Sequence, residues 1–346
     1  MRSPAVNRPA EREKRDFTMR DCRQLIEICR GHKIYIQTHN FPDPDAIASG
    51  FALQNLLKQF QIESVLCYAG KIDKLSARKM TEMFEIDLRS YEEIGLDMRE
   101  EDYIICVDSQ KGGGNVTDFT GNEIACIDHH PFQGDHSCLY EHIQETGSCA
   151  TLIAAYFKEM DVPMDSRTAT VLLYGLKMDT LNFSRGVTLT DIEIFEFLFP
   201  RVNHELLEKM ERNNMELSDL KAYGAAIENI LLYGTVGFAF MPFYCPDALI
   251  AIVADFIMEL EEVEVAIIYA KREDGIKFSV RSENPEIHAG NLVENALLQW
   301  GTGGGHACMA GGMIRKNQEG LLGKYPDLVI REAFLDVISG MKAEVK

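Results

Sequence analysis

Short apolar runs alternate with amphipathic segments over the first half of the chain. The runs at residues 33–37, 63–69, 103–107 and 123–127 are rich in β-branched and aromatic residues, which predicts β-strands. Apolar residues recur at helical spacing over residues 45–60, 74–84, 148–160 and 167–177. Alternating strands and helices indicate parallel pairing with right-handed crossovers. The expected fold is therefore α/β, with a mostly parallel sheet flanked by helices.

A different pattern begins near residue 190. Residues 190–232 are helical and charged without a strand signal, which predicts a helical connector. Strands are expected again at 235–241, 263–271 and 275–281, with helices at 247–260 and 291–300. A length of 346 residues also favours two domains. The expected boundaries are a disordered leader at 1–17, an N-terminal domain at 18–189, the connector at 190–232, and a smaller α/β domain at 233–346. Thr18 and Asp21 form a capping-box-like start for the first helix.

Composition narrows the class of protein. Hydrophobic residues make up 46% of the chain, enough for two cores, and no run of 18 apolar residues is present to span a membrane. The nine cysteines are an odd number without a C-x-x-C pair, and three of them (Cys67, Cys106 and Cys126) lie in predicted strands. Buried, reduced thiols in a cytoplasmic protein are therefore expected.

The charge restricts the partners. The chain has 35 basic and 54 acidic side chains, a formal net charge of −19. Proteins that follow long nucleic acids present basic surfaces, because their affinity comes largely from neutralising phosphates. Long duplex nucleic acid is therefore disfavoured as a partner. Small phosphorylated molecules or very short oligonucleotides, held by a few local cations, fit this charge better.

Candidate metal ligands follow three of the predicted strands. They form the segments His39-x-x-x-Asp43-x-Asp45, Val107-Asp108 and Asp128-His129-His130, and Asp179 ends a predicted helix. The carboxyl ends of parallel strands meet in one crevice, so these side chains should converge. Carboxylates with imidazoles suit Mn²⁺ or Mg²⁺, and a shared carboxylate lets two ions sit about 3.5–4 Å apart. Such sites hydrolyse phosphate esters and anhydrides.

A simpler interpretation exists for the first segment. Phe41-Pro42-Asp43-Pro44-Asp45 has the composition of a turn that caps a helix, with Asp45 as a candidate cap. Taken alone, the segment does not distinguish a cap from a metal site. The other ligand candidates, each expected at the same edge of the sheet, favour the metal.

A second landmark lies downstream, at Gly303-Gly304-Gly305-His306 and Ala310-Gly311-Gly312. The ligand segments resemble the motifs of the DHH phosphoesterase superfamily, and the glycine-rich segment is similar to the signature of the DHH-associated C-terminal domain. The resemblance covers residues 18–340 and is closest to the nanoRNase group, oligoribonucleases that also act as phosphoadenosine-phosphate phosphatases, with a likeness to RecJ. Pro44 departs from the pattern, since many relatives have glycine there.

The resemblance implies roles for individual residues. One ion would be bound by His39, Asp43 and Asp108, and a second by Asp45, Asp108, His129 and Asp179. Asp108 would bridge the ions and His130 would face the scissile phosphate as the acid. Substrate would be bound by Arg281, Gly303, Gly304, Gly305 and His306. The glycine-rich segment at 303–305 is expected to be a turn whose backbone amides can bind an anion. The alternatives are a surface charge for Arg281 and a flexible loop at 303–305.

The resemblance also implies a function. We expect a hydrolase with two Mn²⁺ ions, or Mg²⁺, that degrades short oligoribonucleotides to mononucleotides or converts 3'-phosphoadenosine 5'-phosphate to AMP. Alternatives are a linear or cyclic dinucleotide phosphodiesterase, an exopolyphosphatase and, in another class, a non-catalytic nucleotide-binding sensor. No membrane partner is expected. The sequence leaves the oligomeric state open, a homodimer included.

Overall fold

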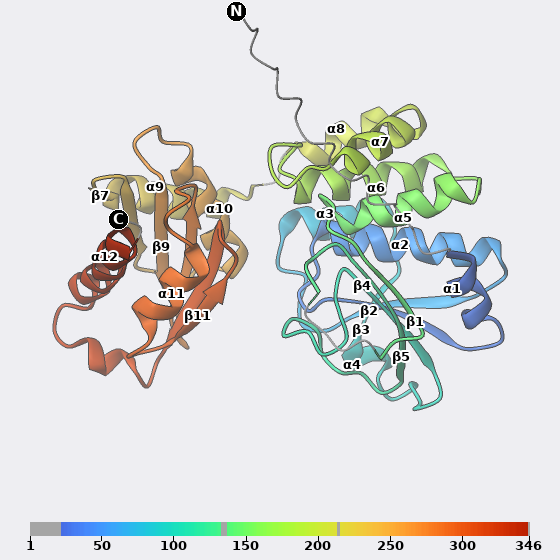
Figure 1. The fold of residues 1–346 in the computed structure, drawn as a ribbon, viewed down its shortest axis with the longest axis horizontal. Helices are drawn as coiled ribbons and strands as arrows, with labels where there is room; N and C mark the ends of the chain where they lie inside the picture. Colours follow the sequence, from blue (N-terminus) through green and yellow to red (C-terminus); the bar gives the residue numbers. More distant parts are fainter. Residues whose placement is uncertain (1–21, 133–136, 213–214, 345–346) are drawn as a thin grey trace, which may run out of the picture. The chain divides into compact units, whose positions relative to one another are not determined.

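A computed structural model describes residues 22–132, 137–212 and 215–344 of the chain. These residues form two compact units (Figure 1). The first extends to residue 211 without 73–78, and the second contains 73–78 and the residues from 212 onward. The expected leader and the helix start at Thr18 and Asp21 lie outside the described residues.

The first unit is built on a six-stranded sheet whose neighbouring strands are all parallel, in the order β3-β2-β1-β4-β5-β6. This confirms the expected parallel α/β sheet. The strands are β1 (Ile34–Thr38), β2 (Ser64–Tyr68), β3 (Leu88–Ser90), β4 (Tyr103–Val107), β5 (Asn122–Asp128) and β6 (Tyr140–Ile143). Strands β3 and β6 were not predicted, because β3 has three residues and β6 contains the polar Glu141 and His142.

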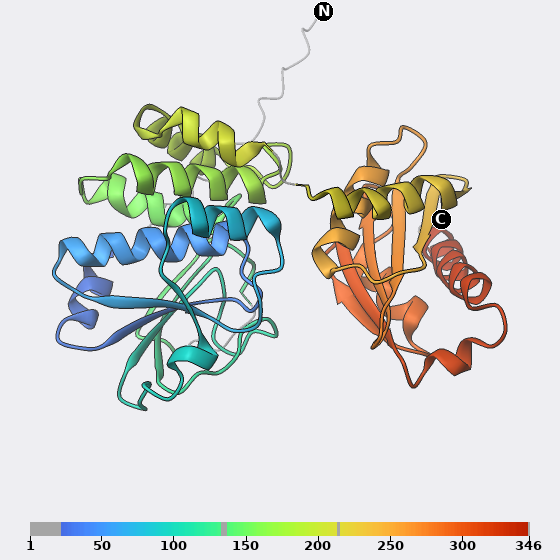
Figure 2. The same cartoon turned by 180° about the vertical axis from the view of Figure 1, so that it is seen from behind.

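Helices of the first unit lie mainly on one face of this sheet. They are α1 (Cys22–Cys29), α2 (Pro44–Gln59), α4 (Tyr91–Ile94), α5 (Cys149–Glu159), α6 (Ser166–Asp179), α7 (Leu189–Leu198) and α8 (His204–Glu211), with the 3₁₀ turn η1 (Phe199–Arg201). Helix α3 (Leu75–Met83) is divided between the two units after residue 78. Helices α2 and α5 contact the sheet, α6 packs on α2 and α5, and α7 and α8 form an outer layer over α5 and α6 (Figure 2). Helix α2 is buried on most sides, as its continuous run of apolar and small residues requires.

The second unit contains another six-stranded sheet, in the order β11-β12-β10-β9-β8-β7. Its β8–β9 pair is parallel and its other pairs are antiparallel. The strands are β7 (Leu231–Tyr233), β8 (Val236–Met241), β9 (Val265–Lys271), β10 (Gly275–Ser282), β11 (Thr302–Gly305) and β12 (Met309–Arg315). The helices are α9 (Leu220–Asn229), α10 (Asp247–Met258), α11 (Ala289–Leu297) and α12 (Pro326–Glu344), with the 3₁₀ turns η2 (Leu217–Asp219) and η3 (Glu319–Leu322).

Alternation along β9 shows how this second sheet is packed on both faces. Val265, Ile267 and Tyr269 join the core formed with α11 and α12. The intervening Ala266, Ile268 and Ala270 join the core formed with α9 and α10. Successive side chains of a strand point to opposite faces, so β9 serves two cores at once.

The segment 190–232, expected as a connector, contributes to both units. Helices α7 and α8 pack on α5 and α6, whereas α9 packs on β8 and α10, and β7 pairs with β8. No helix among the described residues is both long and apolar enough to cross a membrane.

The expected glycine-rich turn at 303–305 is wrong, because Thr302–Gly305 forms strand β11 and pairs with β12. The glycines permit a close contact between this strand pair and α11. A Cβ at Gly303 would lie 2.2 Å from Val293 Cγ1, and a Cβ at Gly312 would lie 2.5 Å from Leu297 Cδ1. Because Gly303 and Gly312 have no side chains, α11 can approach the strands closely. The sequence pattern alone did not reveal this contact.

Candidate metal centre

The ligand-bearing turns lie at the carboxyl ends of β1, β4 and β5, which are neighbours in the first sheet. The chain crosses from β1 to β2 on one side and continues to β4 on the other, so this edge is a topological switch point. Three groups of ligand atoms each lie within 4.8 Å of one another. They are His39, Asp43 and Asp108; Asp45, His129 and Asp179; and Asp108, Asp128, His129 and His130.

The first group centres on His39. Its Nε2 lies 3.5 Å from Asp108 Oδ2 and 3.9 Å from Asp43 Oδ1. Its Nδ1 lies 2.8 Å from the carbonyl oxygen of Asn40, to which it donates when it carries the proton. That hydrogen bond fixes the tautomer and leaves Nε2 as the free ligand atom, an arrangement typical of metal-binding histidines.

Asp43, rather than Asp45, caps α2. Asp43 Oδ1 accepts hydrogen bonds from the amides of Asp45 and Ala46 at 3.0 and 3.2 Å. Pro44 is the first helical residue, where a fixed φ fits and no amide proton is needed. Proline at the second position of the Asp43-x-Asp45 segment therefore supports the helix start and leaves both carboxylates in place.

The second group gathers residues from three elements. His129 Nε2 lies 3.4 Å from Asp179 Oδ2, and its Nδ1 contacts the Thr146 carbonyl oxygen at 3.0 Å. Asp45 is 1% exposed, and its two oxygens accept hydrogen bonds from the first amides of α5, at Cys149 and Ala150 (2.7 and 2.9 Å). These amides hold the carboxylate in one orientation, and its remaining lone pairs stay available for a cation.

Asp108 lies between the two groups. One oxygen faces His39, and the other lies 3.4 Å from His129 Nε2. The side chain is buried, and among the described residues Oδ1 has no hydrogen-bond donor. Its φ of 56° lies in a region that residues other than glycine rarely adopt, and such strain is typical of functional sites. A buried carboxylate oxygen without a donor, among imidazoles and other carboxylates, fits a divalent cation.

Protonation in the metal-free site reflects this crowding. Burial opposes a charged imidazole at His39, but Asp108 and Asp43 outweigh it and raise the pKa of His39 to about 9. Burial and the nearby Asp43 raise the pKa of Asp179 to about 6. Burial also disfavours the charged form of Asp108, yet the adjacent imidazoles of His129 and His39 hold its pKa below the usual range. The imidazole protons thus stand where a cation would bind.

A metal must therefore displace protons from this site. We expect Mn²⁺ affinity to rise with pH, because Asp179 must lose a proton with a pKa near 6 and His39 one with a pKa near 9. Below about pH 6 both groups are protonated, and affinity should fall by up to about tenfold per pH unit for each displaced proton. Calorimetric titration with Mn²⁺ in buffers of different ionisation enthalpy measures the affinity and the protons released. A pH-independent affinity without proton release would contradict this.

Metal binding should also stabilise the first unit. Mn²⁺ at about 100 times its dissociation constant adds about 2.7 kcal/mol to the free energy of unfolding. For a unit of this size, that corresponds to a rise in Tm of roughly 5–10 °C. Thermal unfolding with and without Mn²⁺ tests this, and Asp108→Asn should lose most of the shift. An equal shift in that variant would locate the ion elsewhere.

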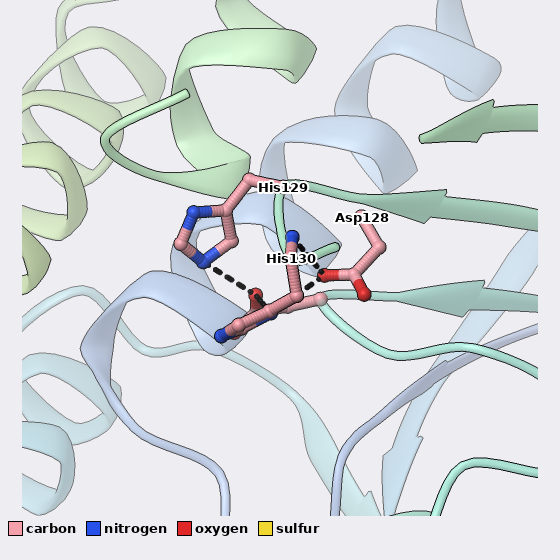
Figure 3. A group of neighbouring side chains, drawn as sticks. Asp128, His129 and His130 are labelled. Atoms are coloured by element: carbon pink, nitrogen blue, oxygen red, sulfur yellow. Dashed lines mark hydrogen bonds and ion pairs between the residues drawn. The ribbon is translucent and has the colours of Figure 1, made fainter. Parts of the chain in front are cut away.

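His130 differs from the other histidines of the site, because its partner is a carboxylate rather than a carbonyl. Figure 3 shows its ring beside Asp128, whose Oδ1 lies 2.9 Å from His130 Nδ1. Gln110 Nε2 donates to Asp128 Oδ2 at 2.7 Å. Asp128 and the nearby Asp108 outweigh burial and raise the pKa of His130. The side chain is 40% exposed, so an oriented imidazolium is accessible to a substrate.

Asp191 of α7 joins the segments that carry two candidate metal ligands, His129 and Asp179. Its buried carboxylate accepts hydrogen bonds from the Gly147 amide (2.8 Å) and the Thr151 hydroxyl (2.6 Å). Gly147 follows Thr146, whose carbonyl oxygen contacts His129. A Cβ at Gly147 would lie 2.6 Å from Thr180 Cγ2, next to Asp179. Sequence reasoning missed Asp191, because the partners that connect it to the site, Gly147 and Thr151, lie 44 and 40 residues away in the chain.

Replacement of Asp191 by asparagine should weaken metal binding. The amide would present N–H groups to the donors at Gly147 and Thr188, which shifts the segment that orients His129. We expect Mn²⁺ affinity to fall about tenfold, the lower end of the range for groups that support metal ligands. Titration with Mn²⁺ measures this, with Glu193→Gln on the exposed side of α7 as the matched control. Unchanged affinity in a folded variant would show that Asp191 is only structural.

The predicted substrate-binding residues lie in the second unit. Arg281 of β10 pairs with Asp255 of α10, and its Nη1 donates to Ser279 Oγ at 3.0 Å. A phosphate would have to compete with Asp255 for this arginine. The segment after β11 folds back on α11, since the carbonyl of His306 accepts a hydrogen bond from the Gly290 amide at 3.0 Å. The His306 side chain is exposed.

Two further polar residues, Arg185 and His288, have local partners. Arg185 Nη2 donates to the carbonyl oxygen of Asp179 at 2.9 Å, which supports the end of α6 beside the candidate metal ligands. His288 caps α11 by accepting a hydrogen bond from the Asn291 amide at 3.2 Å.

Comparison with known proteins agrees with this architecture. Residues 33–176 match the N-terminal domain of the DHH family, and residues 234–330 match the DHHA1 domain. An uncharacterised protein of Methanocaldococcus jannaschii is 26% identical over 321 residues, which cover 90% of this chain and 65% of that protein. The chain thus spans about two thirds of that relative's length. A probable manganese-dependent inorganic pyrophosphatase of Streptococcus pyogenes is 26% identical over 199 residues, covering 56% of this chain and 59% of the relative.

Solved structures show the same fold. An exopolyphosphatase-related protein from Bacteroides fragilis has a TM-score of 0.74 at 18% identity, over 92% of this chain and 96% of that protein. RecJ from Thermus thermophilus, solved with Mn²⁺, has a TM-score of 0.53 at 15% identity, over 92% of this chain and 55% of RecJ. One part of the chain therefore matches the DHH family and another the DHHA1 domain, and these matches support the DHH phosphoesterase superfamily.

Proposed function

We propose that the protein is a metal-dependent phosphoesterase that hydrolyses short oligoribonucleotides to mononucleotides and 3'-phosphoadenosine 5'-phosphate to AMP. The observation that carries this proposal is Asp108, whose two oxygens face the ligand groups of His39 and His129. We assign the first ion to His39, Asp43 and Asp108. The second would be held by Asp45, Asp108, His129 and Asp179.

The protein's own residues perform distinct parts of the reaction. Two bound divalent ions supply Lewis acidity, which activates water and neutralises charge on the phosphate. The carbonyl oxygens of Asn40 and Thr146 keep Nε2 of His39 and His129 directed toward Asp108, where they would hold the ions. His130, oriented by Asp128, donates a proton to the leaving oxygen, a role that suits an exposed imidazolium.

The negative net charge of the protein favours small phosphorylated substrates over long nucleic acids. A net charge of −19 opposes binding along a long polyanion, because the 54 acidic side chains outnumber the 35 basic ones and repel its phosphates. A short oligonucleotide or a single nucleotide needs only local contacts. We assign these to Arg281, the Gly303–Gly305 strand and His306 in the second unit.

A second candidate is hydrolysis of phosphoanhydrides. The names of the pyrophosphatase from Streptococcus pyogenes and the exopolyphosphatase-related protein from Bacteroides fragilis favour it. The same ligand set would serve this reaction, because the charge that develops on the phosphoryl oxygens is similar.

The two candidates are separated by substrate profile. Purified protein with Mn²⁺ is incubated with RNAs from dinucleotides to chains of about 24 nucleotides, since longer chains carry more charge for this acidic protein to bind. 3'-Phosphoadenosine 5'-phosphate, pyrophosphate and tripolyphosphate are tested in parallel. Rates that fall steeply with RNA length support the proposal. Hydrolysis of the anhydrides alone would select the second candidate, and nucleotide binding without hydrolysis would indicate a sensor.

A further inference from the structure

Phe41 is an exposed aromatic residue in the turn that carries two candidate metal ligands. Phe41 is 55% exposed, although it lies between His39 and Asp43. Two residues of chain span at most about 7 Å, so the Phe41 Cα lies within that distance of the Asp43 Cα. An uncovered ring at this position forgoes the stabilisation that burial of phenylalanine would give.

The backbone of Phe41 is also strained. Its φ is 57°, a conformation that bulky side chains rarely adopt. The turn is held there from both sides, since the Phe41 amide donates to the Ala69 carbonyl at 3.1 Å and the Asn40 amide donates to the Asn115 carbonyl at 2.7 Å. Asn40 Oδ1 also accepts a hydrogen bond from the Thr117 amide at 3.1 Å. Strain maintained by surrounding contacts is typical of functional positions.

Gly70 supports one side of the ring. A Cβ at Gly70 would lie 2.9 Å from Phe41 Cε1 and 3.0 Å from Cδ1, closer than real Cβ contacts. Gly70 also has a φ of +83°, so glycine is favoured there for two reasons. The ring therefore rests on bare backbone beyond the end of β2, and its exposed side is available for a ligand.

We propose that Phe41 is a specificity-determining residue that stacks on the nucleobase adjoining the scissile phosphate. This inference rests on the proposed function and deepens it. One ribose joins a base to its phosphate, so a phosphate at the ligands places the base within reach of this turn. Stacking on an aromatic ring accepts every base, because each base has a π-face. A polyphosphate chain offers no ring to stack, so Phe41 distinguishes nucleotides from phosphoanhydrides.

The test compares two substrates that differ only in the base. One is a 5'-phosphorylated diadenosine dinucleotide, and the other carries abasic ribose in place of the nucleosides on both sides of the scissile phosphate. Phe41→Asn removes the ring and suits the positive φ, so the variant should fold with an unchanged or raised Tm. Phe41→Tyr restores a ring. Phe199→Ala, a variant of another exposed aromatic residue in the first unit, is the matched control.

Phe41→Asn should lower kcat/KM for the dinucleotide by about 5- to 150-fold, which is the free energy of stacking one base expressed as a fold-change. Most of this loss should be a rise in KM. The abasic substrate should change less than about twofold, because it makes no stack to lose. Phe41→Tyr and Phe199→Ala should behave like the unmodified protein. An equal loss on both substrates would overturn the proposal by showing that the turn only positions the ligands. Unchanged kinetics on the dinucleotide would overturn it as well.

A binding measurement keeps this inference separate from the proposed activity. Phe41→Trp is made with Trp300→Phe, which removes the chain's single tryptophan. In Mg²⁺ buffer, 5'-AMP should quench the fluorescence of the introduced indole, and ribose 5-phosphate should not. If AMP quenches the fluorescence of a protein that has no hydrolytic activity, the stacking proposal stands and the proposed phosphoesterase activity is rejected. Absence of AMP quenching would reject the stacking site, even in an active enzyme.

Discussion

Replacement of Asp108 by asparagine is expected to abolish hydrolysis, with kcat falling at least about 10³-fold at saturating Mn²⁺. Both oxygens of this buried carboxylate face ligand groups, one toward His39 and the other toward His129. Asparagine keeps the shape but loses the negative charge, and it directs an N–H group at a position where a cation should bind. Steady-state kinetics over a Mn²⁺ titration measure the loss.

A matched control lies at the opposite end of the same strand. Asp102 is also buried and precedes β4, where its Oδ2 accepts a hydrogen bond from the Arg99 amide at 3.0 Å. Asp102→Asn tests the cost of a buried carboxylate to folding without touching the candidate ligands. Asp102→Asn should lower Tm while leaving kcat nearly unchanged. If Asp108→Asn kept more than a tenth of the activity, roughly 1.4 kcal/mol of barrier or less, Asp108 would not be the bridging ligand.

The second large effect is expected for His130→Gln. Loss of a general acid typically lowers kcat by about 10²–10⁴-fold. The effect should depend on the leaving group, because p-nitrophenolate leaves without protonation and a ribose oxygen does not. We therefore expect a large loss on a dinucleotide and a small one on bis(p-nitrophenyl) phosphate. Parallel kinetics on these two substrates measure the difference.

His32→Gln provides the control for this experiment. His32 precedes β1 and stacks on Tyr103, with ring centroids 3.8 Å apart, at the amino end of the sheet. It should leave both rates unchanged. His130→Gln should also retain Mn²⁺ affinity within about twofold, since the proposed ions are bound by other residues. Equal losses on both phosphate substrates, or loss of Mn²⁺ binding, would instead make His130 a metal ligand.

Much of the first unit follows from local sequence patterns. The apolar runs that became β1, β4 and β5 are buried and continuous, and polar ligand residues begin where each run ends. Parallel strands with right-handed crossovers bring such ends together, so His39, Asp108 and His129 could be predicted as neighbours. The structure places their ligand atoms in overlapping groups.

Other features depend on distant contacts that no local pattern contains. Asp43, rather than Asp45, caps α2 because Pro44 begins this helix, one residue earlier than the apolar spacing indicated. The support of His129 involves Thr146 and Asp191, which lie 17 and 62 positions further along the chain. The glycines at 303–305 were taken for a turn, because composition does not reveal that α11 packs against them.

The account's central claim is a pair of divalent ions bridged by Asp108. Crystals grown with Mn²⁺ and measured at the manganese absorption edge test it most directly. We expect two anomalous peaks about 3.5–4 Å apart. One should mark an ion bonded to His39 Nε2, the other an ion bonded to His129 Nε2, and both ions should contact Asp108. One peak, or peaks away from the carboxyl ends of β1, β4 and β5, would contradict the two-ion centre.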